Sequence, residues 1–438
     1  MAHDRLWPAD PSRRTFLQAS AAALGAGAVV SLAGRATAQP VTAKARPKLG
    51  AGDPIRIGVI GTGGMGTNHC TSFMKLVADG KENAQIVAVA DVCDSHAAKA
   101  QKVCEQGQKN DVASFRDYRD LLKRDDIHAV LIATPEHWHT QNALDAIATG
   151  KDVYVEKPMT LKVEDAVILH RACEKNPEII FQVGTQMTQI PKYHEARKLI
   201  NAGAIGKPTF SQTSYCRNSK DGEWNYYKID PEWKPGVNLD WAMWCGPAGA
   251  AEWDPMVFAR WRRYRRWSTG IIGDLLVHVL TPLVMAIDQG FPVRVNAIGG
   301  HYVDKAMENH DQVNITIQFE KEHTMIVAGS TCNEVGLETI IRGHKGNIYL
   351  GANNVVLRPE RIYSEEIDEK TVICADIGND QDVHRVAWMK SIRSREKPFS
   401  DATLGLKIMA IVDLATRSMW DGGRAYTFDP TTFAVKAV

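Results

Sequence analysis

The sequence has no cysteine pattern of the kind that builds a disulfide framework or a zinc site. It contains no C-x-x-C, and no group of cysteine and histidine residues has the spacing of zinc ligands. Its eight cysteines are scattered at positions 70, 93, 104, 173, 216, 245, 332 and 374. We therefore expect no metal site and mostly free, buried thiols, with one or two disulfides left open.

The chain also lacks an excess of charge of either sign. Its 52 Lys and Arg side chains against 51 Asp and Glu leave a formal net charge of +1, so no nucleic-acid partner is predicted. The mildly apolar run Ala19–Ala33 is short and rich in alanine and glycine, which argues against a stable membrane span after signal removal. With 44% hydrophobic and 24% charged residues, the composition is that of a globular protein of two or three domains.

The first 38 residues have the features of an export signal. Ser12–Leu17, which reads SRRTFL, is a twin-arginine signature, and Ala36-Thr37-Ala38 fits the small-x-small cleavage rule. We predict a signal peptide over 1–38, a linker over 39–54 and a periplasmic or otherwise exported protein. The alternative is a disordered tail in which the arginine pair has no role.

A glycine turn organises the rest of the chain. Ile55–Ile60 reads as a buried parallel strand, and Gly61, Gly63 and Gly66 follow it with the G-x-G-x-x-G spacing of a dinucleotide site. Gly61 permits the tight turn, Gly63 lets the backbone approach the pyrophosphate, and Gly66 lets the next helix lie close to the strand. The predicted cofactor-binding residues of this turn are Gly61, Thr62, Gly63, Gly64, Met65 and Gly66.

An acidic residue ends the next predicted strand, 86–91. Asp91 stands where a carboxylate binds the ribose hydroxyls, and no basic residue follows at once to hold a 2′-phosphate. The sequence therefore predicts NAD as cofactor in preference to NADP. The alternative is a glycine turn in an α/β domain that binds no ligand.

Strands and helices alternate over 55–185 and not beyond. Strands are predicted at 55–60, 86–91, 128–133, 152–155 and 179–183, with helices at 64–79, 95–106, 138–149 and 161–175. This alternation predicts an α/β Rossmann domain over 55–185. After it, β-type runs followed by helices at 380–394 and 402–420 predict an α+β domain over 186–438 with a large, mostly antiparallel sheet.

A second stretch that could carry chemistry is Gly270–His278. If it is helical from Gly273, Asp274 and His278 lie four residues apart on one face of an apolar helix. An acid and a histidine in such surroundings must pair or face a cleft. The alternative is a helix-capping aspartate and a histidine whose hydrogen bonds are satisfied in the core.

These motifs occur together in one order. The order is the glycine turn, the Thr134-Pro135 loop with His139, Glu156-Lys157-Pro158, and Gly273-Asp274-x-x-x-His278. In this set the chain resembles the glucose–fructose oxidoreductase and inositol dehydrogenase family, Gfo/Idh/MocA, over nearly everything after the signal. Leu239-Asp240-Trp241 and Trp244–Ala248 resemble its exported twin-arginine branch. The chain departs from the usual family pattern at Leu276, Thr281 and Thr188, so its substrate can differ.

The resemblance implies a role for each motif. Lys157 would lie beside the nicotinamide and the reacting hydroxyl, next to Pro158 in a cis peptide bond. His278 would accept the hydroxyl proton, a task suited to its ordinary pKa of ~6.5, while Asp274 would orient the substrate or His278. The further cofactor contacts that the resemblance implies are Thr134, Pro135, His139, Glu156 and Lys157.

The stretch 224–267 holds seven of the eleven tryptophans and an arginine-rich run, 260–266. The tryptophans could stack on sugar rings, but we favour packing or a subunit contact. The arginines could bind an anionic sugar or a phosphate, but we favour a solvated face or structural salt bridges.

The sequence as a whole predicts an oxidoreductase that moves hydride from a ring hydroxyl of a sugar, polyol or derivative to a tightly bound nicotinamide cofactor. We expect a carbohydrate or polyol substrate and a homo-oligomer. Two alternatives stay open: an NAD-dependent glycosidase that oxidises the sugar transiently, and a non-catalytic sugar-binding protein.

Overall fold

The computed structural model describes residues 44–45 and 48–438. The predicted signal peptide, 1–38, lies outside these residues, as does much of the predicted linker, 39–54. None of the described helices is long and apolar enough to cross a membrane. All eight cysteines carry free thiols, four of them buried and four half-buried.

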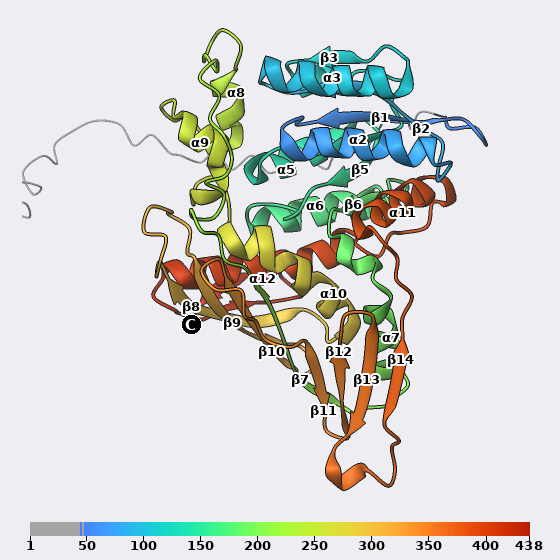
Figure 1. Ribbon diagram of the computed structural model, residues 1–438, viewed down its shortest axis with the longest axis vertical. Helices are drawn as coiled ribbons and strands as arrows, with labels where there is room; N and C mark the ends of the chain where they lie inside the picture. Colours follow the sequence, from blue (N-terminus) through green and yellow to red (C-terminus); the bar gives the residue numbers. More distant parts are fainter. Residues whose placement is uncertain (1–43, 46–47) are drawn as a thin grey trace, which may run out of the picture. The chain divides into compact units, whose positions relative to one another are not determined.

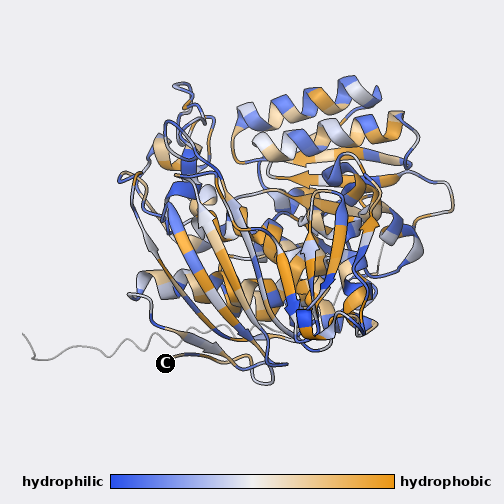
Figure 2. Cartoon of the chain, turned by 60° about the horizontal axis from the view of Figure 1, so that its bottom comes forward, coloured by the Kyte–Doolittle hydropathy of each residue, from blue (hydrophilic) through white to orange (hydrophobic). Residues whose placement is uncertain are grey.

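Six parallel strands form the sheet that carries the glycine turn, in the order β3-β2-β1-β4-β5-β6 (Figure 1). The strands are β1 (Ile55–Ile60), β2 (Ala84–Ala90), β3 (Ala113–Phe115), β4 (Ala129–Ile132), β5 (Asp152–Val155) and β6 (Phe181–Val183). Figure 2 shows these strands as largely hydrophobic, because helices cover both faces of the sheet.

Helices connect these strands and complete the predicted doubly wound fold, which is confirmed. They are α2 (Gly64–Ala78), α3 (Asp94–Gln108), α4 (Tyr118–Leu122), α5 (Glu136–Ala148) and α6 (Val163–Lys175). The strand order reverses between β1 and β4, so the carboxyl ends of these two strands flank a crevice. Strand β3 and helix α4, which the sequence pattern did not predict, are both very short.

The second sheet has ten strands in the order β14-β13-β12-β11-β7-β10-β9-β8-β15-β16. They are β7 (Pro208–Cys216), β8 (Pro292–Gly300), β9 (Gln312–Phe319), β10 (Thr324–Ser330), β11 (Ile340–Gly343), β12 (Gly346–Leu350), β13 (Asn354–Pro359), β14 (Lys370–Ile373), β15 (Tyr426–Phe428) and β16 (Val435–Ala437). All its pairs are antiparallel except β7 with β10, which confirms the predicted mostly antiparallel sheet. Burial alternates along β9, so one face of the sheet is packed and the other is exposed.

Helices pack on the second sheet and also return to the first. They are η1 (Gln186–Gln189), α7 (Pro191–Asn201), α10 (Val277–Ile287), η5 (Arg361–Tyr363), α11 (Asp380–Ser394) and α12 (Ala402–Trp420). α12 lies against β8 and α6. α11 lies against α2, where the Trp388 ring contacts Phe73, so the C-terminal part of the chain also helps to build the dinucleotide-binding part.

A long excursion between β7 and α10 lies beside the parallel sheet (Figure 1). We call residues 217–269 the cap. It contains α8 (Trp241–Cys245), η2 (Gly246–Ala248), α9 (Pro255–Arg260) and η3 (Trp261–Arg263). Backbone hydrogen bonds join the cap to the carboxyl end of β2: Asp94 N–H donates to the Asn238 carbonyl and Asp240 N–H to the Val92 carbonyl, each over 2.9 Å.

Candidate active site

The glycine turn has the geometry that a dinucleotide phosphate requires. Gly61 has a φ of +82°, which favours glycine, and a Cβ on Gly66 would overlap the Gly61 carbonyl oxygen. Helix α2 starts at Gly64 without a side-chain cap, and nothing lies within 4 Å of where a Gly64 Cβ would be. The first N–H groups of this helix are therefore available to a phosphate.

Asp91 follows β2 beside this turn. Its Oδ2 accepts a hydrogen bond from the Thr62 N–H at 2.6 Å, and its Oδ1 accepts one from the Cys93 N–H at 2.9 Å. These bonds hold the carboxylate at the edge of the cleft. An ionised carboxylate there suits the two ribose hydroxyls of NAD and disfavours a 2′-phosphate.

A cleft opens over the turn. Seven residues predicted to bind the cofactor line it: Gly61, Gly63, Gly64, Met65, Asp91, Thr134 and Pro135. It also contains residues that the sequence did not single out, among them Arg116, Trp138, Asn142 and Met243. The glycine turn, the bare helix end and Asp91 together fit NAD. Among the described residues, no group of three or more His, Cys, Asp or Glu side chains could hold a metal ion.

The cap supplies the opposite wall of the cleft. Trp244 and Trp261 line it, and the Trp244 carbonyl accepts hydrogen bonds from both the Trp138 indole and the His137 ring at 2.8 Å. Trp241 stacks on Trp244 with ring centres 4.6 Å apart. At the centre of the cap the tryptophans therefore pack against one another, which is the role that we favoured over stacking on sugar rings.

Two residues predicted to contact the cofactor, His139 and Glu156, do not line the cleft. His139 is buried, and its ring nitrogen atoms lie 2.7 Å from the Pro158 carbonyl and 2.8 Å from the Thr134 carbonyl. Glu156 is buried beside His69, 2.8 Å away. Neither side chain lines the cleft in this structure, and their contact with the cofactor stays a prediction.

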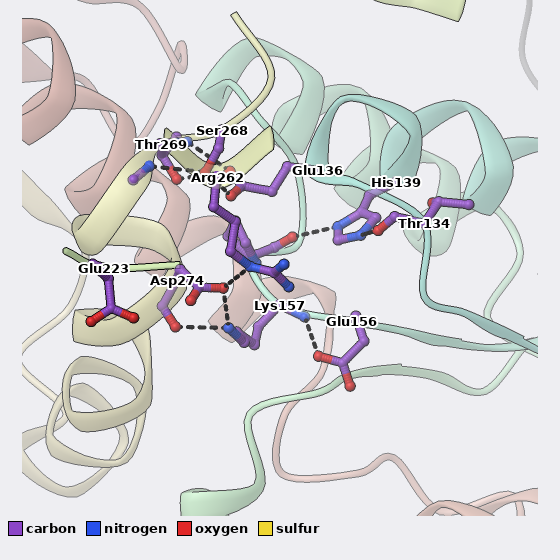
Figure 3. A network of polar contacts seen from close by, with 12 residues as sticks. Thr134, Glu136, His139, Glu156, Lys157, Glu223, Arg262, Ser268, Thr269 and Asp274 are labelled. Carbon is purple, nitrogen blue, oxygen red and sulfur yellow. Dashed lines mark hydrogen bonds and ion pairs between the residues drawn. The ribbon is translucent and has the colours of Figure 1, made fainter. Parts of the chain in front are cut away.

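Lys157 and Asp274 meet beside Arg262, which lines the cleft. The Lys157 Nζ donates to both the carbonyl and the Oδ1 of Asp274, each at 2.7 Å, and the peptide bond to Pro158 is cis, as expected (Figure 3). Burial alone would raise the pKa of Asp274, but the charges of Lys157 and Arg262 outweigh it and hold that pKa well below its usual range. Asp274 is therefore ionised and fixes the ammonium group of Lys157.

The stretch from Gly273 is helical, but its first turn is not an α-helix. Residues Ile272–Leu276 form a π-helical turn, and the α-helix α10 begins at Val277. Single π-helical turns occur often at functional sites. A Cβ on Gly273 would overlap the Thr269 hydroxyl and crowd Pro158, so the turn approaches the cis-proline loop closely. Asp274 consequently hydrogen-bonds to Lys157 and Arg262, and no hydrogen bond joins it to His278 in the described structure.

His278 lies on the first turn of α10. Its Nδ1 is buried and has no hydrogen-bond partner among the described residues. Burial and, next in weight, the charge of Lys157 lower the pKa of His278 to about 3, so the ordinary value expected from the sequence does not apply. At neutral pH the imidazole is therefore unprotonated and able to accept a proton.

Glu136 is a buried residue of the site that the sequence did not single out. It accepts hydrogen bonds from the Ser268 hydroxyl, from the Thr269 N–H at 2.9 Å and from the Thr269 hydroxyl at 2.8 Å (Figure 3). These bonds tie the end of the cap to the start of α5. Burial raises the pKa of Glu136 to about 7, against the effect of those three hydrogen bonds.

We expect Glu136→Gln to change how stability depends on pH. Because the folded-state pKa is about 7 against an ordinary 4.5, the folded protein holds this proton more tightly than the unfolded chain does. The stabilisation is complete below the unfolded pKa and is lost as the pH rises through the folded one. Relative to the wild type, the variant should gain up to about 3 kcal/mol between about pH 5 and about pH 8, measured by urea unfolding.

The matched control is Glu334→Gln at an exposed position. It should keep the wild-type dependence of the unfolding free energy on pH. Parallel curves for the wild type and Glu136→Gln would mean that Glu136 does not titrate in this window.

Comparison with protein families places both parts of the chain. A family model described as "Oxidoreductase family, NAD-binding Rossmann fold" matches residues 55–185. A second model, described as "Oxidoreductase family, C-terminal alpha/beta domain", matches residues 197–427.

Curated relatives match over part of their length. A glycosyl hydrolase family 109 protein of Shewanella baltica (strain OS155) is 33% identical over 239 residues, which cover 50% of this chain and 48% of the relative. Glycosyl hydrolase family 109 protein 2 of Shewanella sp. (strain ANA-3) is 35% identical over 163 residues, 35% of either chain. An uncharacterized oxidoreductase of Streptococcus pneumoniae serotype 4 is 27% identical over 306 residues, 68% of this chain and 69% of the relative. The chain thus spans about half or less of the length of these glycosyl hydrolase relatives.

Solved structures share the fold. A levoglucosan dehydrogenase in complex with NADH and L-sorbose is 18% identical, with a TM-score of 0.64 over 85% of this chain and 98% of that one. An NAD-binding oxidoreductase from Klebsiella pneumoniae gives the same identity, TM-score and coverage. At this identity the similarity extends to the fold alone.

Proposed function

The chain belongs to the Gfo/Idh/MocA oxidoreductase family, whose Rossmann domain binds NAD, and from this premise we propose that it oxidises a ring hydroxyl of a sugar, polyol or derivative. The observation that carries the proposal is that Lys157 is hydrogen-bonded to Asp274 and that the charges of both act on the buried His278 imidazole. A fixed ammonium group can stabilise the charge that develops on the reacting oxygen, and an unprotonated imidazole whose Nδ1 has no partner among the described residues can take up the proton. The structure of levoglucosan dehydrogenase, which holds NADH and L-sorbose, supports a carbohydrate substrate.

Each of these side chains has a defined task in the proposed reaction. Bound NAD supplies the hydride acceptor. Lys157 donates a hydrogen bond to the reacting oxygen and stabilises the negative charge that grows on it. His278 accepts the hydroxyl proton, and Asp274 holds the ammonium group of Lys157 in place.

We further propose that the protein is exported and keeps its NAD. The twin-arginine signature at Arg13-Arg14 supports export in the folded state. The cap supports retention, because Trp244 and Trp261 wall the cleft opposite the glycine turn. A ligand that binds only the folded state stabilises it by RT ln(1 + [L]/Kd), so folding where NAD is abundant favours the loaded form. The expected homo-oligomer stays a prediction.

The glycosyl hydrolase family 109 relatives favour a second candidate function. In it, the same groups would oxidise a sugar carbon transiently so that a glycosidic bond can break, and the sugar would then be reduced again. NAD would end in its starting form, and the net reaction would be hydrolysis.

A product assay on holoprotein separates these functions. Protein purified without added nucleotide is denatured, and mass spectrometry of the supernatant should find about one NAD per chain. Net NADH formation with a free sugar supports the dehydrogenase, whereas release of sugar from a glycoside without net NADH supports the glycosidase. Sugar binding without either product would leave a non-catalytic binding protein. Little bound NAD that exchanges on dialysis would remove the retention proposal.

A further inference from the structure

Intramolecular contacts account for most of the arginine-rich run, residues 260–266, as the sequence led us to favour. Four of its five arginines are held by other groups: Arg260 by the Tyr227 carbonyl, Arg263 by Asp304, Arg265 over the Trp420 ring and Arg266 by the carbonyls of residues 248–250. None of these four arginines lines the cleft.

Arg262 is the exception, because it lines the cleft and reaches the catalytic pair. Its Nε donates to the Oδ1 of Asp274 at 2.8 Å, and its guanidinium group lies 4.2 Å from the centre of the Trp261 ring. Figure 3 shows the side chain extending toward Asp274 and Lys157. Its two terminal nitrogen atoms make no hydrogen bond within the described part of the chain, although the side chain is only 21% exposed.

Charge and geometry both leave Arg262 ready for an anion. Asp274 Oδ1 is shared with Lys157, so one carboxylate faces two cations. Glu156 is paired with His69, and Glu136 with Ser268 and Thr269, so neither is free to bind Arg262. With Nε occupied, the guanidinium still presents its two Nη groups as a fork, the geometry that binds a carboxylate or phosphate through two parallel hydrogen bonds.

We propose that Arg262 binds an acidic group of the substrate, so that the substrate is an acidic sugar rather than a neutral one. The inference rests on the proposed function and adds the substrate class to it. Because Arg262 Nε and Lys157 Nζ bind the same oxygen atom, the acidic group and the reacting hydroxyl lie within one small sugar. A carboxylate is the planar group that the fork fits best; a phosphate or sulfate ester has the same charge chemistry.

The test compares matched neutral and acidic sugars on holoprotein. D-Glucose is paired with D-glucuronate, D-galactose with D-galacturonate, and each neutral sugar with its 6-phosphate. The rate at which the bound NAD is reduced in a single turnover, measured against sugar concentration, gives kcat/KM, and calorimetry gives binding. The wild type should prefer the acidic member of a pair. Arg262→Gln should lower kcat/KM for the acidic member by about 10- to 100-fold more than for the neutral member, because any disturbance of Asp274 affects both members alike.

Two further variants make the result specific. Arg262→Lys keeps the charge but loses the fork, so it should recover only part of the preference. Arg265→Gln, exposed and outside the cleft, should behave as wild type.

Four outcomes would overturn the inference. A wild type that prefers the neutral sugars, or a preference that Arg262→Gln leaves unchanged, would do so while the proposed function stands. Loss of NAD from Arg262→Gln without loss of preference would assign the arginine to a phosphate of the nucleotide. If no sugar reduces NAD, the proposed function fails. Calorimetry then still tests the binding of an acidic group by Arg262, because acidic sugars that bind the wild type no better than neutral ones would exclude that site.

Discussion

Replacing Lys157 with methionine should lower kcat by about 10²- to 10³-fold, the usual effect of removing one donor that stabilises a developing oxyanion. The Lys157 Nζ is fixed by the carbonyl and carboxylate of Asp274, so its position changes little as the reaction proceeds. Methionine keeps the length and apolar stem of the side chain but cannot donate a hydrogen bond. The NAD content should stay at the wild-type level, because the lysine side chain does not line the dinucleotide cleft.

Lys162→Met is the matched control, since it changes an exposed lysine on the same connection before α6. Steady-state rates and the nucleotide content of both variants decide the matter. If the kcat of Lys157→Met lay within a few-fold of that of Lys162→Met, the ammonium group of Lys157 would have no part in the chemistry.

The long, strongly patterned elements could be predicted from the sequence. Strand β1 and helices α11 and α12 begin and end where their apolar spacing predicted, because each buries a continuous face. The short elements could not be predicted. Strand β14 has four residues, none of them buried, and β3 has three, so neither has a hydrophobic pattern to detect.

The candidate site divides in a similar way. Gly61 and Asp91 were predictable because backbone geometry and ligand chemistry restrict which residues can stand there. The contacts of His139 could not be predicted, because its motif does not say which groups the ring meets, and in the structure its two ring nitrogen atoms lie beside two backbone carbonyls. Glu136 could not be assigned, because its contacts are with residues far away in the sequence. Arg262 could not be singled out among its neighbouring arginines, because only the fold shows that it lines the cleft.

The cap shows what a local pattern leaves out. The sequence shows that tryptophans are concentrated in the cap, but only the fold shows that Trp244 and Trp261 form one wall of the cofactor cleft. The π-helical turn at Ile272–Leu276 is a second case, since its sequence is equally compatible with an ordinary α-helix. Close approach of Gly273 to Thr269 and Pro158, a tertiary contact, accompanies the altered turn.

Replacing His278 with alanine should lower kcat by about 10²- to 10⁴-fold, the usual contribution of a general base. NAD should remain bound, because His278 does not line the dinucleotide cleft. The control is His344→Ala in the turn between β11 and β12, which also removes an imidazole from the second domain and should keep wild-type turnover.

The dependence of kcat/KM on pH is a second test of the role of His278, because a loss of packing would not produce the same change in the pH profile. With the pKa of His278 at about 3, the base is already unprotonated at higher pH, so the wild type should show no loss of activity from this group between about pH 5 and about pH 8. Because the charge of Lys157 helps to lower that pKa, Lys157→Met should raise it and move the acid limb of its residual activity to higher pH. The opposite result is a wild-type activity that falls at low pH with a midpoint near the ordinary pKa of histidine, ~6.5, and a midpoint that does not move in Lys157→Met. That result would assign proton transfer to another group.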